Sequence, residues 1–530
     1  MTSTLSPSAL LEMVLGDAEY ALIDVREQGS FADAHLLFAV NVPLSRLELM
    51  VGALIPRHDV PIILVDDPKV ERFADQAGKV LTGMGYRHVQ VLEGGIDGWR
   101  EAGGELFSGI NVPSKAFGEF VEHTYDTPRM DAAEIKDMLD RGRNMVVVDS
   151  RPYAEYHRMN IPGATDVPGA ELVYRIHDLA PDPATLVVVN CAGRTRSIIG
   201  AQSLINAGVP NDVVALKDGT MGWHLAGFAL EHGATRSATL PSAEALETAI
   251  ACSDRVAERF GVSTISAGEA HAWCADSTRT TYLLDVRSPE EFAAAHLSGS
   301  RNAPGGQLVQ ATDEYVAVKN ARLVLIDHAI VRATMTASWL IQMGWRDVRV
   351  LDPDGEWDVT WATQLQPQRA PSYAVSDAPG IATHELEAML DEACVIDLSP
   401  SPVFERSHIP GAIWTVRARL RGAAEACQPQ QTLVLTSTDG NLANLAAADA
   451  RTVRAEPVLV LAEGNKRWIE EGRNTAAGLA DTFGPLDDVW YKPYDHRDQQ
   501  EAFMRSYLTW EVALVEQIER DGTTRFRRFD

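Results

Sequence analysis

The sequence predicts an α/β protein built from four tandem copies of one unit, each a parallel sheet flanked by helices, plus a C-terminal extension. Three observations predict this fold class. The chain has 530 residues, too many for a single hydrophobic core. Short apolar segments alternate with helical segments, a pattern typical of parallel strands covered by helices on both faces. One pattern of residues also recurs four times along the chain, which sets the number of units.

The start of each unit is an apolar strand that ends in aspartate. These aspartates are Asp24, Asp149, Asp285 and Asp397. Arginine follows two positions later in the first three units, as Arg26, Arg151 and Arg287, whereas the fourth unit has Ser399. A leucine or isoleucine comes twelve residues after every aspartate, at Leu36, Ile161, Leu297 and Ile409. Because the spacing agrees without gaps, we expect the four units to share one fold.

The end of each unit is a strand followed by a glycine turn and a tryptophan. The tryptophans are Trp99, Trp223, Trp357 and Trp468, and we expect them to anchor the cores. The units are therefore placed at residues 1–125, 126–250, 251–372 and 373–475, and the extension at residues 476–530. Helices are expected at residues 197–207 and 333–343, among others.

Composition limits the classes of partner and cofactor. The formal net charge of -27 excludes nucleic acid and anionic membranes as expected partners, because like charges repel. The five cysteines stand singly, so we expect no disulfide framework, no metal site and no cofactor. The first twenty residues lack a basic region with a long apolar core, and no segment is apolar enough to span a membrane. We therefore expect a cytoplasmic protein.

The second unit carries the candidate active site. An apolar strand at residues 186–190 runs into the loop C-A-G-R-T-R-S, residues 191–197, and then into a helix. Backbone N–H groups at a helix start, together with arginines, stabilise a thiolate and bind a small anion beside it. We therefore predict Cys191 as the catalytic nucleophile. The substrate-binding residues are predicted to be Gly193, Arg194, Thr195 and Arg196.

Three further residues are expected to support this loop: Asp149, Arg151 and Ser197. Asp149 ends the first strand of the unit, and we expect it to hydrogen-bond to the backbone of the cysteine loop. Arg151 is expected to pair with Glu155, four residues further on.

These motifs resemble the rhodanese family of sulfurtransferases. The shared features are the Asp-x-Arg after the first strand, the His-Ile-Pro-Gly-Ala turn at residues 408–412, the cysteine loop and the Gly-Gly…Trp ending, which together cover residues 8–475. The resemblance implies a thiosulfate sulfurtransferase. In this chemistry Cys191 takes the sulfane sulfur of thiosulfate, or of a similar small anionic donor, as a persulfide. Cyanide, a thiol or a protein cysteine then accepts the sulfur.

The resemblance also implies that the other three units are catalytically silent. Cys191 lies 42 residues after Asp149, and the same offset gives Asp66 in the first unit and Asp327 in the third. Alignment of the preceding strand places Ser437 in this position of the fourth unit. Neither a carboxylate nor a serine forms a persulfide.

The cysteine loop departs from the family pattern at two places. Gly193 is third in the loop and Arg194 fourth, whereas the family usually has glycine fourth. Asn160 stands where histidine usually precedes the Ile-Pro-Gly-Ala turn. The first departure bears on the choice of substrate, and the second bears on structure.

Two other functions remain open on the sequence. The same general fold hosts cysteine phosphatases, but their loop is one residue longer than the six residues from Cys191 to Arg196. Three units without a thiol also fit a scaffold that binds partner proteins or relays sulfur. The extension is rich in aromatic residues and has a helical pattern at residues 504–518, so we expect it to pack against the units or against a partner in a homodimer.

Overall fold

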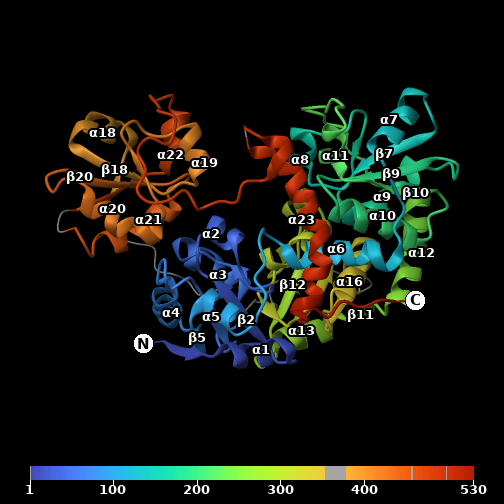
Figure 1. The fold of residues 1–530 in the computed structure, drawn as a ribbon, viewed down its shortest axis with the longest axis horizontal. Coiled ribbons are helices and arrows are strands. Elements are labelled where there is room, and N and C mark those ends of the chain that lie inside the picture. Colours follow the sequence, from blue (N-terminus) through green and yellow to red (C-terminus); the bar gives the residue numbers. More distant parts are fainter. Residues whose placement is uncertain (1, 353–377, 455–456, 497, 530) are drawn as a thin grey trace.

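The computed structural model describes residues 2–352, 378–454, 457–496 and 498–529. The chain folds into four α/β units and a C-terminal extension (Figure 1). Two expectations lie outside the described residues: the boundary between residues 372 and 373, and the core residue Trp357.

The first unit contains five strands of its own. They are β1 (Ser3–Leu5), β2 (Tyr20–Asp24), β3 (Val40–Asn41), β4 (Ile62–Val65) and β5 (Val89–Leu92). Its helical elements are α1 (Pro7–Leu15), α2 (Gln28–Asp33), η1 (Leu44–Arg46), α3 (Leu47–Leu54), α4 (Phe73–Gly83) and α5 (Gly95–Glu101). Helix α6 (Val112–Tyr125) then connects to the second unit.

The second unit repeats this order. Its strands are β6 (Arg129–Met130), β7 (Met145–Asp149), β8 (Thr165–Asp166), β9 (Leu186–Asn190) and β10 (Val213–Leu216). Its helical elements are α7 (Ala132–Asp140), α8 (Tyr153–Arg158), η2 (Gly169–Glu171), α9 (Leu172–Leu179), α10 (Thr195–Ala207) and α11 (Gly219–Leu225). Helix α12 (Ala243–Phe260) leads on to the third unit, and the helix predicted at residues 197–207 is confirmed as α10.

The third unit adds one strand to the pattern. Its strands are β11 (Ser263–Ile265), β12 (Thr281–Asp285), β13 (Arg301–Asn302), β14 (Val318–Lys319), β15 (Arg322–Ile326) and β16 (Val348–Leu351). Its helical elements are α13 (Ala267–Ala275), α14 (Pro289–Ala294), α15 (Gly305–Gln310), η3 (Thr312–Glu314) and α16 (Val331–Gln342). Helix α16 confirms the helix predicted at residues 333–343.

The fourth unit and the extension complete the chain. The strands are β17 (Gly380–Ile381), β18 (Ala393–Asp397), β19 (Ile413–Trp414), β20 (Thr432–Thr436) and β21 (Val458–Leu461). The helical elements are α18 (Thr383–Ala388), η4 (Leu390–Glu392), α19 (Ser401–Arg406), η5 (Arg417–Arg419), α20 (Leu420–Ala426), α21 (Asn441–Ala450) and α22 (Gly464–Glu470). The extension forms η6 (Pro493–Asp495) and α23 (Gln500–Asp521), which is longer than the helix predicted at residues 504–518.

The sheets confirm the predicted fold class. The strand order is β6-β10-β9-β7-β8 in the second unit, β11-β16-β15-β12-β13 in the third and β17-β21-β20-β18-β19 in the fourth. The first sheet has six strands, ordered β1-β5-β4-β2-β14 with β3 beside β2. Strands within a unit pair in parallel, and β7 and β9 end together with Asp149 opposite Asn190. The carboxyl ends of the two central strands therefore meet at one edge, where ligands bind in such sheets.

The first and third units share one hydrophobic core. Strand β14 of the third unit pairs antiparallel with β2 of the first, and one core cluster contains buried residues of both units, such as Ile62 and Leu323. The fourth unit has separate cores and lies to one side in Figure 1, whereas α23 lies back among the other units and packs against α6. Each of Trp99, Trp223 and Trp468 is buried and donates its ring N–H to a carbonyl six residues later, which confirms their role as core anchors.

The expectation of no disulfide framework is wrong for one pair of cysteines. Cys394 at the start of β18 and Cys427 at the end of α20 form a disulfide, with Cα atoms 6.0 Å apart. The two residues are 33 positions apart in sequence, and only the packing of α20 on the sheet brings them together. Cys191, Cys252 and Cys274 are free thiols.

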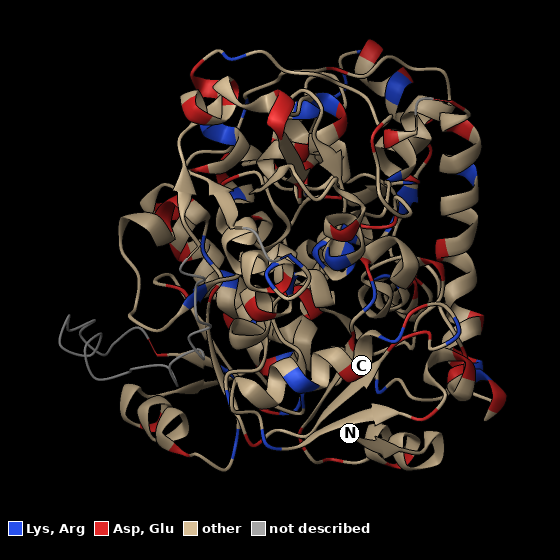
Figure 2. Cartoon of the chain, turned by 90° about the vertical axis from the view of Figure 1, so that its left-hand side faces the viewer, with Lys and Arg blue, Asp and Glu red and all other residues tan. Residues whose placement is uncertain are grey.

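The charges of the chain are distributed over all of its units. Lysine and arginine side chains lie interspersed with aspartate and glutamate across the elements in Figure 2. Of the helices in the described ranges, none is both long and apolar enough to cross a membrane.

Candidate active site

The cysteine loop lies at the carboxyl end of β9, a central strand of the second sheet. Residues 187–190 of this strand are buried, and Cys191 follows directly, with α10 beginning at Thr195. The loop carbonyls are bonded to the start of α11. The Cys191 carbonyl accepts hydrogen bonds from the Thr220 backbone N–H (2.8 Å) and hydroxyl (2.9 Å), and the Ala192 carbonyl accepts from the Met221 N–H (3.0 Å). The loop is therefore held on both sides, by its own strand and by the following glycine turn.

This contact explains the repeated glycine of the unit endings. Gly219 has a φ of +55°, and a Cβ there would lie 2.4 Å from the Cys191 carbonyl oxygen. The equivalent glycines, Gly95 and Gly464, would meet the carbonyl oxygens of Asp66 and Ser437 in the same way, at 2.3 and 2.1 Å. Glycine is needed at each position because the turn passes against the backbone of the loop.

The Cys191 thiol is buried, with 2% of the residue exposed. Its Sγ lies 3.4 Å from the Ser197 Oγ, and Ser197 donates in turn to the Arg194 carbonyl (2.9 Å). Burial raises the pKa of Cys191, and this effect outweighs the charge of Arg196 and the hydrogen bonds with Ser197, which lower it. Of the two arginines predicted to stabilise the thiolate, Arg196 lowers the pKa of Cys191, but burial keeps this pKa above its ordinary value.

Arg196 is the cation that acts on the thiol. Its Nη2 lies 2.9 Å from Glu155 Oε2, and the other oxygen of Glu155 lies 3.3 Å from Lys492 of the extension. Burial alone would raise the pKa of Glu155, but the charges of Arg196 and Lys492 lower it to about 2. Arg196 thus stays next to the thiol as a charged group held in place by an ionised carboxylate.

Arg194 points away from the thiol toward α6. Its guanidinium binds Glu119 (2.7 Å), Glu122 and Asp218 (3.3 Å), and 7% of the side chain is exposed. Three carboxylates therefore occupy the donors of Arg194, which clamps the cysteine loop to α6 and to the start of α11. Its predicted contact with substrate remains a prediction, and the geometry favours Arg196.

Asp149 and Arg151 form a fully buried pair beneath the loop. The Arg151 Nη2 lies 2.7 Å from Asp149 Oδ2, and Arg151 also donates to the Met159 carbonyl. The expected pairing of Arg151 with Glu155 is wrong, since Glu155 binds Arg196 and Lys492 instead. Asp149 supports the loop through a side chain rather than through backbone N–H groups of the loop. It accepts from the amide of Asn190 (2.8 Å), the residue before the cysteine.

The C-terminal extension covers the cysteine loop. A Cβ on Gly193 would lie 3.1 Å from Glu511 Oε2 and 3.5 Å from Tyr507 Cε1, so α23 lies directly against the loop. Glu511 Oε1 accepts hydrogen bonds from the Tyr507 hydroxyl (3.0 Å) and from the Thr195 hydroxyl (3.4 Å). The extension therefore packs against the units of its own chain. This is one of the two arrangements that the sequence predicts.

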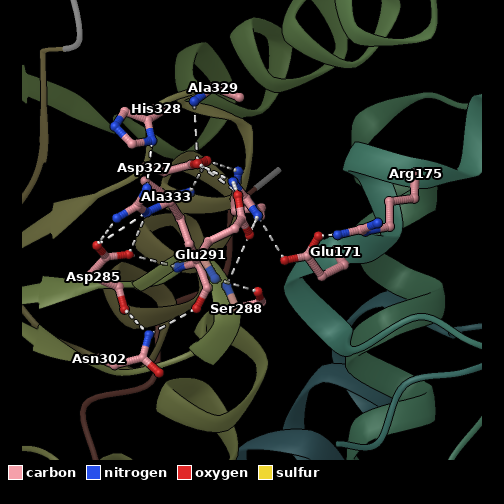
Figure 3. A network of polar contacts seen from close by, with 12 residues as sticks. Glu171, Arg175, Asp285, Ser288, Glu291, Asn302, Asp327, His328, Ala329 and Ala333 are labelled. Carbon is pink, nitrogen blue, oxygen red and sulfur yellow. Dashed lines mark hydrogen bonds and ion pairs between the residues drawn. The ribbon is translucent and has the colours of Figure 1, made fainter. Parts of the chain in front are cut away.

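The equivalent positions of the other units are filled by their own polar contacts. Asp66 accepts from the Ala74 N–H (2.8 Å), and Ser437 Oγ accepts from the Ala443 N–H (3.3 Å). Asp327 accepts from the Arg332 N–H (2.8 Å) and pairs with its guanidinium (2.8 Å), which also reaches Glu171 of the second unit (Figure 3). In each of these three units, the side chain at the position of the thiol accepts a hydrogen bond from a backbone N–H at the start of the following helix.

Sequence reasoning missed the groups that other elements bring to the site. These are Glu119 from α6, Glu155 as the partner of Arg196, and Tyr507 and Glu511 from α23. The aromatic content of the extension indicated that it packs on something. No local pattern showed that its target is the cysteine loop, 316 residues away in the case of Thr195 and Glu511.

The chain matches the family model described as the Rhodanese-like domain four times, at residues 6–102, 131–226, 266–354 and 382–471. These matches cover more than half of the chain. The chain belongs to the rhodanese-like family.

Known proteins resemble this chain either over its whole length or over short stretches. A solved thiosulfate sulfurtransferase from Pseudomonas aeruginosa is 45% identical, with 100% of both chains covered and a TM-score of 0.93. The HTH-type transcriptional regulator Rv0324 of Mycobacterium tuberculosis is 34% identical over 90 residues, 17% of this chain and 39% of that protein. SseB of the same species is 43% identical over 57 residues, 11% of this chain and 20% of that protein. The chain thus matches less than half of the length of these two curated relatives.

Proposed function

We propose that this rhodanese-like protein is a thiosulfate sulfurtransferase that carries sulfane sulfur as a persulfide on Cys191. The observation that carries the proposal is the position of this thiol. It ends a central parallel strand, faces the start of α10, and lies within the field of Arg196. The likeness to the Pseudomonas aeruginosa enzyme over the full chain supports thiosulfate as the donor.

The first step loads the enzyme. The Cys191 thiolate attacks the outer sulfur of thiosulfate and forms a new S–S bond, while the original S–S bond breaks and its electron pair leaves with sulfite. The charge of Arg196 stabilises the thiolate before attack and the charge that develops on sulfite. Backbone N–H groups of Gly193 and Thr195 lie in the same loop and are proposed to bind the donor oxygens. The proposed part of Arg194 is to fix the loop through its three carboxylates.

The second step unloads the enzyme. A nucleophile such as cyanide or a thiolate attacks the terminal sulfur of the persulfide, and the electron pair of the S–S bond returns to Cys191 as thiolate. The thiolate is itself a competent nucleophile, so the cycle needs no general base. Donor and acceptor react in turn at one sulfur atom, so ping-pong kinetics are expected.

The test is the intact mass of the protein after incubation with thiosulfate and desalting. We expect one added sulfur atom on the wild type, lost on addition of cyanide as thiocyanate forms, and none on Cys191→Ser. Cys252→Ser is the matched control, because Cys252 is also a buried free thiol in the chain. Sulfur that still loads on Cys191→Ser, or none on the wild type, would contradict the proposal.

The same samples test the other two functions. Hydrolysis of a phosphate ester without sulfur loading would favour a cysteine phosphatase. Capture of a partner protein that persists in Cys191→Ser, again without loading, would favour a scaffold. A cytoplasmic location and a homodimer remain predictions, tested by cell fractionation and by light scattering.

A further inference from the structure

Glu511 is an acidic group of the extension that lies against the cysteine loop. It lies on α23, 2% exposed, with Oε2 placed 3.1 Å from where a Cβ of Gly193 would be. Its charge is near enough to Cys191 to raise the pKa of that thiol. A carboxyl group therefore stands beside the place where the proposed function puts an anionic donor.

The two oxygens of Glu511 are in different surroundings. Oε1 accepts two hydrogen bonds, from Tyr507 and Thr195. Oε2 is buried and has no hydrogen-bond partner among the described residues. A buried polar atom without a partner is costly, and such atoms in native proteins mark positions that a ligand or another group satisfies. Because Oε1 already accepts from two donors, Oε2 is the oxygen that carries the proton when the group is neutral.

We propose that Glu511, in its neutral form, donates a hydrogen bond from Oε2 to the anionic sulfur donor bound at Cys191. This inference rests on the proposed function and assigns to the extension a part in donor recognition. The neutral carboxyl attracts the anion through its O–H, whereas the ionised carboxylate repels it as a like charge in a water-poor site. Glu511 is thus a substrate-binding residue that admits the donor in one protonation state.

The charged groups around Glu511 come from three elements. Lys115 and Glu119 face it from α6, Arg194 from the cysteine loop, and Tyr507 from α23 itself. Burial and Glu119 raise the pKa of Glu511, while Lys115 and Arg194 lower it, and the result is about 7. The proton is therefore lost near neutral pH.

Lys115 is held in an aromatic cage rather than against the carboxylate. Its Nζ lies 5.5, 5.6 and 5.3 Å from the ring centroids of Trp490, Tyr507 and Trp510, and it donates to the Ile110 carbonyl. Burial lowers the pKa of Lys115. Removal of this ammonium should raise the pKa of Glu511 further. Variants of Lys115 and of Glu511 should therefore change the pH dependence of donor binding in different ways.

The experiment measures kcat and KM for thiosulfate between pH 6 and pH 9 in the full-length protein. In the wild type we expect KM to rise about tenfold from pH 6 to pH 8.5, the size of one lost hydrogen bond to a charged group. Glu511→Gln keeps a neutral donor at every pH, so its KM should stay flat. Lys115→Gln should keep the rise and move it to higher pH. Glu516→Gln, on an exposed part of α23, is the matched control and should follow the wild type.

Alkylation of Cys191 by the uncharged reagent iodoacetamide provides the second readout. Its rate should increase with pH in every folded variant, because it reports the thiolate and not the binding of an anion. A wild type without the rise in KM, a Glu511→Gln profile that still rises, or a Lys115→Gln profile that does not rise would each overturn the inference. A wild type that is alkylated but takes up no sulfur from thiosulfate at any pH would instead overturn the proposed function.

Discussion

Gly219 offers the sharpest test of how the loop is held. A Cβ at this position would lie 2.4 Å from the Cys191 carbonyl oxygen and 2.7 Å from the Gly193 carbonyl oxygen, whereas ordinary contact begins at 3.4 Å. Either the loop or the turn must therefore move by about 1 Å, and a shift of this size at a reacting group costs roughly 100-fold in rate. The left-handed φ of +55° adds about 1–2 kcal/mol of strain for alanine.

We therefore expect Gly219→Ala to load sulfur roughly 100-fold more slowly than the wild type while it remains folded. The assay is single-turnover release of sulfite, with circular dichroism and thermal unfolding on the same samples. Two controls separate strain from displacement. Gly227 has a φ of +84°, and its Cβ would meet no described atom within 4 Å, so Gly227→Ala carries the strain alone.

The second control places the same clash in a silent unit. Gly464 has a φ of +62°, and its Cβ would lie 2.1 Å from the Ser437 carbonyl oxygen. Gly464→Ala should lower the melting temperature and leave the loading rate unchanged. Loading of Gly219→Ala at the wild-type rate, with a melting temperature like that of Gly227→Ala, would refute the argument that this contact positions the thiol.

Three further predictions concern charge, burial and the disulfide. Arg196→Met should move the pH profile of iodoacetamide alkylation to higher pH, because the guanidinium lowers the pKa of the Cys191 thiol; an unchanged profile would contradict this. Asp327→Asn should cost about 1–3 kcal/mol of unfolding free energy in denaturant titrations, because the buried Arg332 loses one of its three carboxylate partners and keeps Glu171 and Glu291, while the folded fraction still loads sulfur. Replacing Cys394 and Cys427 by serine should cost about 2–4 kcal/mol without changing the loading rate, and two extra thiols on alkylation of the unfolded wild type would show that the disulfide is absent.

Local patterns in the sequence were enough to predict the fold and to single out the thiol that we propose as the nucleophile. The apolar strands, their terminal aspartates and the tryptophans recur at matching intervals, so the sheets and helices follow from hydrophobic periodicity. Cys191 could be proposed from the sequence because its surroundings are contiguous: a buried strand lies before it, and arginines and a helix start follow it. Ser197 was expected to support the loop; it donates a hydrogen bond to the Arg194 carbonyl and also contacts the thiol, which the sequence did not predict.

Pairings between distant segments were decided by the tertiary structure. Arg194 and Arg196 are equivalent cations on the sequence, and only the carboxylates of α6 and α8 show that one clamps the loop and the other acts on the thiol. Strand β14 joins the sheet of another unit. The disulfide of the fourth unit forms because packing brings Cys394 and Cys427 together.

The same holds for Glu511, which reaches the loop from the end of the chain. The sequence determined which residues are apolar, which are charged and where each strand and helix lies, because those properties depend on neighbours a few positions apart. The partner of a buried charge and the protonation state of a buried carboxyl depend on the groups that packing places around them. For Glu511 and Lys115 these groups come from α6, the cysteine loop and the extension, and no spacing along the chain encodes that meeting.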